Sequence, residues 1–176
     1  MRALLIIPAA AASLLAFTAP SSAPPPLDDA TVVAILDAAN TLDIQAGEMA
    51  LQKSQTKAVR DLAQQFINDH KAVQQQGQDL ARKLGVTPTP PEQFALADQH
   101  AKAMAELEAK SGAEFDQAFA RKEVTYHQAA LDVIDQTLLP AVQNEELKAF
   151  VAQVGPAFKG HLEAAKQLEK TLQASS

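Results

Sequence analysis

Apolar residues recur at three- and four-residue steps in four long stretches of the chain, and this spacing predicts four amphipathic helices. Residues that favour helix ends mark their limits. We expect Asp28 or Asp29, Ser54 and Asn144 to cap the N-terminal ends of three helices. We expect Gly85 and Pro140 to mark the C-terminal ends of two helices. The expected helices cover about 28–50, 54–84, 113–139 and 144–172.

A proline-rich loop and a weaker helix separate the second and third of these helices. Residues 86–91 contain three prolines, which predict a loop. Residues 92–110 predict a helix of about 19 residues, or ~28 Å at 1.5 Å per residue, which suits a crossover along the bundle. The pattern therefore predicts an all-α fold, a four-helix bundle with an additional crossover helix, over residues 28–174.

The first residues are typical of an export signal. Arg2 supplies a positive charge, residues 3–17 are apolar, and small residues follow at 18–23. The apolar run is short for a membrane-spanning helix, so cleavage is favoured over an uncleaved anchor. We expect a signal peptide at 1–23, a proline-rich tether at 24–27, and a mature periplasmic chain without a transmembrane segment.

Composition narrows the chemistry of the mature chain. The absence of cysteine excludes disulfides and thiolate metal sites. Removing Arg2 with the signal changes the formal charge from −6 to −7, so nucleic acid is not an expected partner.

Three histidines each replace an apolar residue in the inward stripe of a different helix: His70, His127 and His161. Counting 1.5 Å per residue from the turns places all three near the middle of the bundle, with Asn40 and Asp43 close to the level of His70. A buried imidazole without a partner costs on the order of 1–3 kcal/mol, so the three rings predict a shared polar network or a shared ligand.

Two main interpretations of these histidines remain open. In one, the rings form a structural polar layer, bonded to carboxylates, Asn40 or Tyr126, that sets the register of the helices. In the other, they bind one transition-metal ion together with Asp43, Glu123 or Asp116, a donor set that suits zinc, copper, iron or nickel. The pattern favours the polar layer over the metal, and both over a small-molecule pocket.

Other polar residues in the sequence have no expected role in a site. His100 has polar neighbours and is expected in solvent, Tyr126 is expected at the flank of its helix, and Asp69 is expected to be an exposed acid.

The chain resembles domain-of-unknown-function family 4142. The resemblance rests on residues 42–47 (LDIQAG) and 59–70 (VRDLAQQFINDH), the pair Phe115-Asp116, His127, and the late pair His161-Leu162. It implies an exported bacterial protein with a ferritin-like bundle, and it implies no reaction. Asp43 stands where the family more often has Glu.

A di-iron centre is disfavoured. Ferritin-like di-iron enzymes use Glu-x-x-His on two helices. Here Ile67, Val124 and Phe158 stand three residues before the histidines. Two functions follow: a non-catalytic envelope or stress protein that binds a partner or forms a homo-oligomer, which the pattern favours, or a mononuclear metal-binding protein.

Overall fold

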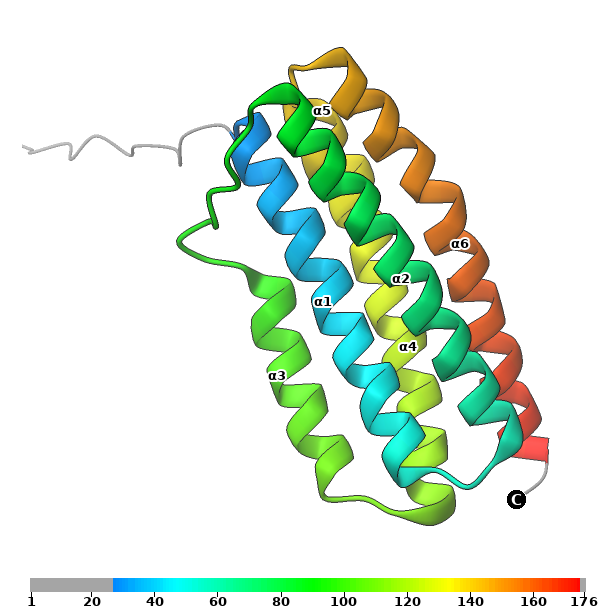
Figure 1. Cartoon of the computed structure of the whole chain (residues 1–176). Helices are drawn as coiled ribbons and strands as arrows, with labels where there is room; N and C mark the ends of the chain where they lie inside the picture. The colour runs from blue at the N-terminus through cyan, green and yellow to red at the C-terminus, as the bar shows by residue number, and fades with distance from the viewer. Residues whose placement is uncertain (1–26, 175–176) are drawn as a thin grey trace, which may run out of the picture.

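The computed structural model describes residues 27–174, and within this range the regular structure is entirely helical (Figure 1). This confirms the all-α class. The elements are α1 (Asp29–Lys53), α2 (Lys57–Leu84), α3 (Ala95–Glu108), α4 (Gly112–Val133), the π-helical turn η1 (Ile134–Leu138), α5 (Leu139–Ala141) and α6 (Glu145–Ala174).

The molecule is a ferritin-like four-helix bundle built from two helical hairpins, α1 with α2 and α4 with α6. The segment that contains α3 carries the chain back along the bundle, so α2 and α4 run in the same direction (Figure 1). The predicted crossover helix is confirmed, but it is shorter than expected, with 14 residues. Phe94 packs against the apolar core in a non-helical conformation, and α3 begins only after it.

Helix ends agree with the sequence at three positions. The Asp28 carboxylate accepts a hydrogen bond from the Thr31 backbone N–H at 2.8 Å. Gly85 follows α2 with φ of 67°, in the left-handed region. Glycine adopts this conformation with little steric strain because it has no Cβ atom. The Asn144 side chain accepts from the backbone N–H groups of Glu146 and Leu147 at 2.9 and 3.1 Å.

Two predicted helix limits were wrong. Ser54 ends α1 rather than capping α2, because its own N–H bonds to Ala50 O, and α2 begins after Thr56. Pro140 does not stop the third main helix. The turn before it widens to π geometry, in which Leu139 N–H bonds to Ile134 O, and helical structure continues to Ala141.

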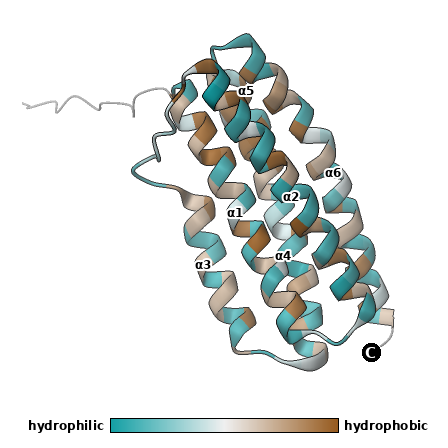
Figure 2. Ribbon diagram, viewed as in Figure 1, coloured by the Kyte–Doolittle hydropathy of each residue, from teal (hydrophilic) through white to brown (hydrophobic). Residues whose placement is uncertain are grey.

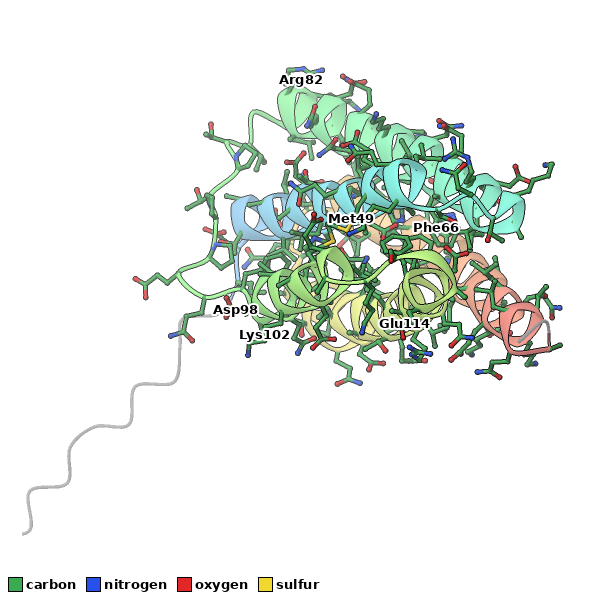
Figure 3. The ribbon with its side chains drawn as sticks, turned by 90° about the horizontal axis from the view of Figure 1, so that it is seen from below. Met49, Phe66, Arg82, Asp98, Lys102 and Glu114 are labelled. Carbon is green, nitrogen blue, oxygen red and sulfur yellow. The ribbon has the colours of Figure 1, made fainter. Side chains whose placement is uncertain are left out.

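The interior consists of two apolar clusters with a polar layer between them. On α1, Val32 to Ala39 belong to one cluster and Ala46 and Ala50 to the other, while buried Asn40 and Asp43 lie between. Hydrophobic and hydrophilic residues are interspersed along the helices of the ribbon (Figure 2). Seen along the bundle, Phe66 points into the interior and Arg82 projects outward (Figure 3).

Within residues 27–174, no helix has the length and hydropathy required to cross a membrane. The expected signal peptide and nearly all of the expected tether lie outside the described residues.

Candidate metal centre

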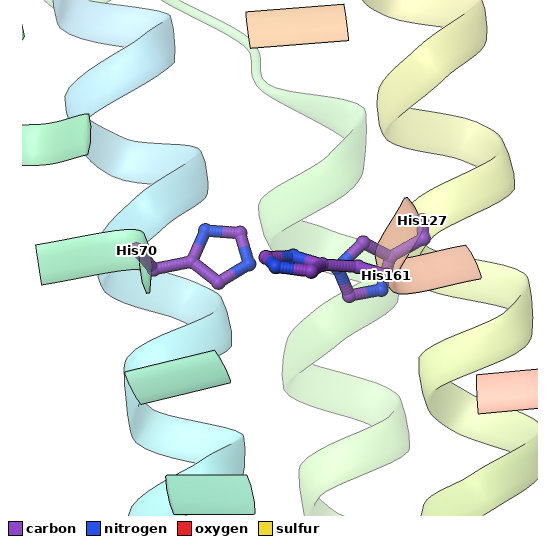
Figure 4. Close-up of side chains that lie close together, drawn as sticks. All are labelled: His70, His127 and His161. Carbon is purple, nitrogen blue, oxygen red and sulfur yellow. The ribbon is translucent and has the colours of Figure 1, made fainter. Parts of the chain in front are cut away.

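His70, His127 and His161 meet in the centre of the bundle, from α2, α4 and α6 (Figure 4). Their ring centroids lie 5.0 to 5.6 Å apart, and all three residues are buried. One potential ligand nitrogen from each ring lies within 4.8 Å of the other two. The structure therefore brings together the three histidines that the sequence singles out.

Each histidine uses one ring nitrogen to bond an oxygen on the outer side of the cluster. His70 Nδ1 lies 2.8 Å from Asn40 Oδ1, His127 Nδ1 lies 3.0 Å from the Glu123 backbone oxygen, and His161 Nε2 lies 3.0 Å from Asp69 Oδ2. Since these oxygens accept hydrogen bonds, each outer nitrogen carries the N–H. The Asn40 orientation is itself fixed, because its Nδ2 donates to Leu36 O at 2.7 Å.

The other nitrogen of each ring faces the cluster and lacks a hydrogen bond among the described residues. These atoms are His70 Nε2, His127 Nε2 and His161 Nδ1. In a neutral ring whose outer nitrogen holds the proton, each inner nitrogen presents a lone pair. Three buried lone pairs facing one another form a suitable donor set for a cation.

Asp43 adds a carboxylate to this donor set. Its Oδ2 lies 3.0 Å from His70 Nε2, but the two atoms do not form a well-directed hydrogen bond. Burial opposes ionisation of Asp43, yet the Lys122 ammonium, 3.1 Å from its Oδ1, holds its pKa well below the usual range. An anionic oxygen facing an imidazole lone pair is stable only with a proton or a metal ion between them.

Lys122 and Glu123 complete the buried network beside Asp43. Lys122 Nζ lies 3.1 Å from Asp43 Oδ1 and 3.0 Å from Glu123 Oε1. Burial and the Asp43 carboxylate raise the pKa of Glu123 well above its usual range. Asp43, Glu123 and His127 form a second group with metal-ligand spacing, but the Lys122 ammonium already lies between its two carboxylates.

Aromatic rings keep the centre dry. Phe66 packs on His161 and His127 with ring centroids 4.4 and 4.9 Å away, and Phe158 packs on His70 at 5.0 Å. Burial lowers the pKa of His127 to about 3 and, for the same main reason, also lowers the pKa of His161. At neutral pH these two rings are therefore neutral, which is the form that binds metals.

A surface hollow of about 500 Å³ between α2 and α6 leads to this centre. His70 and His161 lie at its inner end, and Asp69 is half exposed at its margin. Pro156 and Gly160, two small residues of α6, form part of its wall. The hollow therefore extends from the surface to two of the three histidines.

For three residues expected outside the site, the structure adds to or corrects what the sequence predicts. His100 is buried, because it shares one face of α3 with Leu96 and Leu107. Tyr126 is also buried, and its hydroxyl donates to Ala39 O at 2.5 Å. Asp69 is not merely an exposed acid, because it orients His161.

One expected ligand, Asp116, is not part of the site, and one residue that was not expected there, Lys122, is. Asp116 belongs to neither group of residues with metal-ligand spacing, and it accepts a hydrogen bond from Thr56 Oγ1. Lys122 was missed, because a lysine next to a glutamate on a helix ordinarily indicates a solvated face. Its spacing of four residues from Tyr126 and Ala118 is the signal that could have placed it inward.

The family of the chain is now clear. The model of the family Domain of unknown function (DUF4142) matches residues 15–168. The chain belongs to this family. The resemblance seen in the sequence is thus confirmed, and a comparison with curated proteins found no match.

The fold is similar to that of CopM in complex with copper. The Cu(II)-bound form is 18% identical, with a TM-score of 0.63, over 83% of this chain and 98% of CopM. For the Cu(I)-bound form the identity is 16%, the TM-score 0.65, and the coverage 82% and 97%. A DUF305 fragment from Deinococcus radiodurans is 20% identical, with a TM-score of 0.63, over 85% and 99%. These TM-scores show a shared fold.

Proposed function

We propose that this DUF4142 protein is a non-catalytic metal-handling protein that binds one divalent transition-metal ion through His70, His127, His161 and Asp43. The observation that carries the proposal is the set of three inward ring nitrogens that lack hydrogen bonds while their outer nitrogens are all bonded. A purely structural polar layer would use both nitrogens of each ring, since an unsatisfied buried polar group costs about 1–3 kcal/mol.

The outer partners are those that a metal centre requires. Metal-binding histidines donate their second N–H to a carboxylate or carbonyl, which fixes the tautomer and ring orientation. Asn40, the Glu123 backbone and Asp69 fill these positions. The Glu123 backbone oxygen thus supports His127, while the Glu123 side chain pairs with the Lys122 ammonium through Oε1.

The donor set favours copper or zinc. Imidazole and carboxylate suit divalent ions of borderline softness, and Cu²⁺ binds such sites more tightly than Zn²⁺. The copper-bound state of CopM, a protein of similar fold, supports this choice. The three histidines with ligand spacing, joined by Asp43 beside His70, would give a four-coordinate site without an open position for a substrate, which favours storage or transfer over catalysis.

Export belongs to this proposal. The charged start, the apolar run at 3–17 and the small residues at 18–23 support a cleaved signal and a periplasmic location. Mass measurement of protein recovered from cells should place the mature N-terminus between about residues 20 and 27. Recovery of uncleaved protein from the cytoplasm would contradict export without affecting the metal site.

The metal site is tested by elemental analysis of protein expressed without a histidine tag. We expect about one copper or zinc per chain, as a closed four-ligand site predicts. His127→Ala should lose this metal, because it removes an inward nitrogen from the centre of the cluster. His100→Ala is the matched control, since it removes a buried histidine outside the cluster and should leave the metal content unchanged.

The same preparations should respond to metal in thermal unfolding. An ion at 100 times its Kd stabilises the folded state by about 2.7 kcal/mol, so copper should raise the melting temperature and a chelator should lower it. Metal content far below one per chain, together with a melting temperature unchanged by copper, zinc and chelator, would contradict the proposal and restore the structural polar layer.

A further inference from the structure

A second cavity lies on the opposite side of Lys122 from the histidine cluster, between α3 and α4. Its volume is about 420 Å³, within the range of ~300–1,000 Å³ typical of small-molecule sites. One face of each helix lines it, with residues spaced three and four apart. The apolar part of its lining comes from Leu96, Ala103, Leu107, Ala118 and the Tyr126 ring.

His100 is a buried polar side chain in the wall of this cavity. It is 5% exposed, and within the described part of the chain neither of its ring nitrogens has a hydrogen-bond partner. Burial, followed by the Lys122 charge, lowers the pKa of His100 to about 4, so the ring offers one N–H donor and one acceptor at neutral pH. A buried ring with two unused polar atoms indicates a ligand that supplies them.

Positive charge lies further along the same cavity. Arg121 and Lys110 line it, against a single acidic residue, Glu106, while Lys122, also in the lining, is paired with Asp43 and Glu123. The His100 ring lies next to the Tyr126 ring, with centroids 6.1 Å apart. Arg121 precedes Tyr126 by five residues on α4, which is a rise of roughly 7.5 Å along the helix axis.

We propose that the cavity between α3 and α4 binds a small organic carboxylate with an apolar body, whose carboxylate pairs with Arg121 and whose opposite polar group bonds to His100. The apolar lining receives the body of the ligand. The rise of roughly 7.5 Å between Arg121 and Tyr126, whose ring lies beside His100, suits molecules with a polar group about 6–8 Å from the carboxylate. The site shares no ligand atom with the metal centre and does not depend on it.

The probe that matches this spacing is 4-hydroxybenzoate, titrated into the purified protein by calorimetry and by NMR of the ¹⁵N-labelled histidine rings. We expect saturable binding of one probe per chain, with the largest shifts at the His100 nitrogens. Binding should weaken at least about fivefold for 4-hydroxybenzamide, which lacks the charge, and for benzoate, which lacks the hydroxyl.

Protein variants assign the binding to this cavity. Arg121→Gln and His100→Leu should each weaken binding at least about fivefold, whereas Arg82→Gln, which alters an exposed arginine outside the cavity, should not. His100→Leu should also keep or raise the melting temperature, because it removes two unsatisfied buried polar atoms. Retained folding with weakened binding separates a ligand contact from a packing defect.

The Kd of the probe should be equal with and without chelator, because the cavity shares no ligand atom with the metal centre. Chelator-sensitive binding would show a carboxylate bound to metal and would overturn the assignment. No saturation up to roughly 10 mM probe, or equal Kd for wild type and Arg121→Gln, would also overturn it. So would sedimentation showing a self-associated protein whose His100 resonances move only with protein concentration, because a second copy would then cover the cavity.

Discussion

Lys122 is a buried charge whose removal should have a large effect on stability. Its ammonium lies between Asp43 and Glu123, which are both almost fully buried. Because Asp43 stays ionised, removing Lys122 leaves a buried carboxylate without its main counter-charge. A buried ion pair adds little stability compared with apolar residues in the same place. Removing only one partner is strongly destabilising, because the other charge is left buried without a counter-charge.

Lys122→Met should therefore lower the free energy of unfolding by about 3–5 kcal/mol, since methionine keeps the length of the side chain but not the charge. Denaturant unfolding of metal-free protein measures this. Lys166→Met is the control, because Lys166 pairs with Glu163 at the surface and should cost less than about 1 kcal/mol. Equal, small effects of both variants would mean that Asp43 is not ionised in the folded protein.

The sequence located the three histidines of the site but not the state of their nitrogens. Their positions follow from helical periodicity, which is local. Which nitrogen is bonded depends on Asn40, Asp69 and the Glu123 backbone, and Asn40 and Asp69 reach their histidines from other helices. The direction of an imidazole within a bundle cannot be derived from spacing along one helix.

At the scale of the elements, the contact between α1 and α2 depends on Gly47. A Cβ atom added there would lie 2.7 Å from Ile67 Cγ1 and 3.1 Å from the Ala63 backbone oxygen. A backbone oxygen on a packed helix cannot move aside without moving α2. The close approach of the two helices is therefore the reason for glycine at this position in the middle of α1.

Gly47→Ala should destabilise the protein by about 1–3 kcal/mol, because overpacking exceeds the gain in helix propensity of roughly 0.5–1 kcal/mol. Gly160→Ala in α6 should instead stabilise it by up to about 1 kcal/mol, since the added Cβ meets nothing within 4 Å. Thermal unfolding of the two variants compares them directly. Stabilisation of both would contradict the close α1–α2 contact.

At the scale of the whole molecule, the buried neutral histidines make stability depend on pH. His127 has a folded pKa of about 3, well below its unfolded value of ~6.5. The unfolded state therefore binds more protons between these values, and stability is full above about 6.5 and falls as pH decreases toward 3. His100, with a pKa of about 4, acts in the same direction.

Unfolding curves in the presence of chelator should show this loss. From His127 alone, the free energy of unfolding at pH 5 should be lower than at pH 7.5 by about 2 kcal/mol. The opposite trend, with stability fading as pH rises through neutrality, would show histidines held as charged partners of Asp43.

The amino-acid sequence alone determined the all-α class, the crossover, three of the helix caps and the inward position of three histidines. These properties depend on periodicity and on cap chemistry, which act over a few neighbouring residues. Only the tertiary structure decided that His100 and Lys122 are buried, that Asp69 orients His161, and that Pro140 follows a π turn within continuous helix. Each of these depends on how one helix is rotated and placed against another, because burial of a polar side chain is decided by partners that are distant in the sequence.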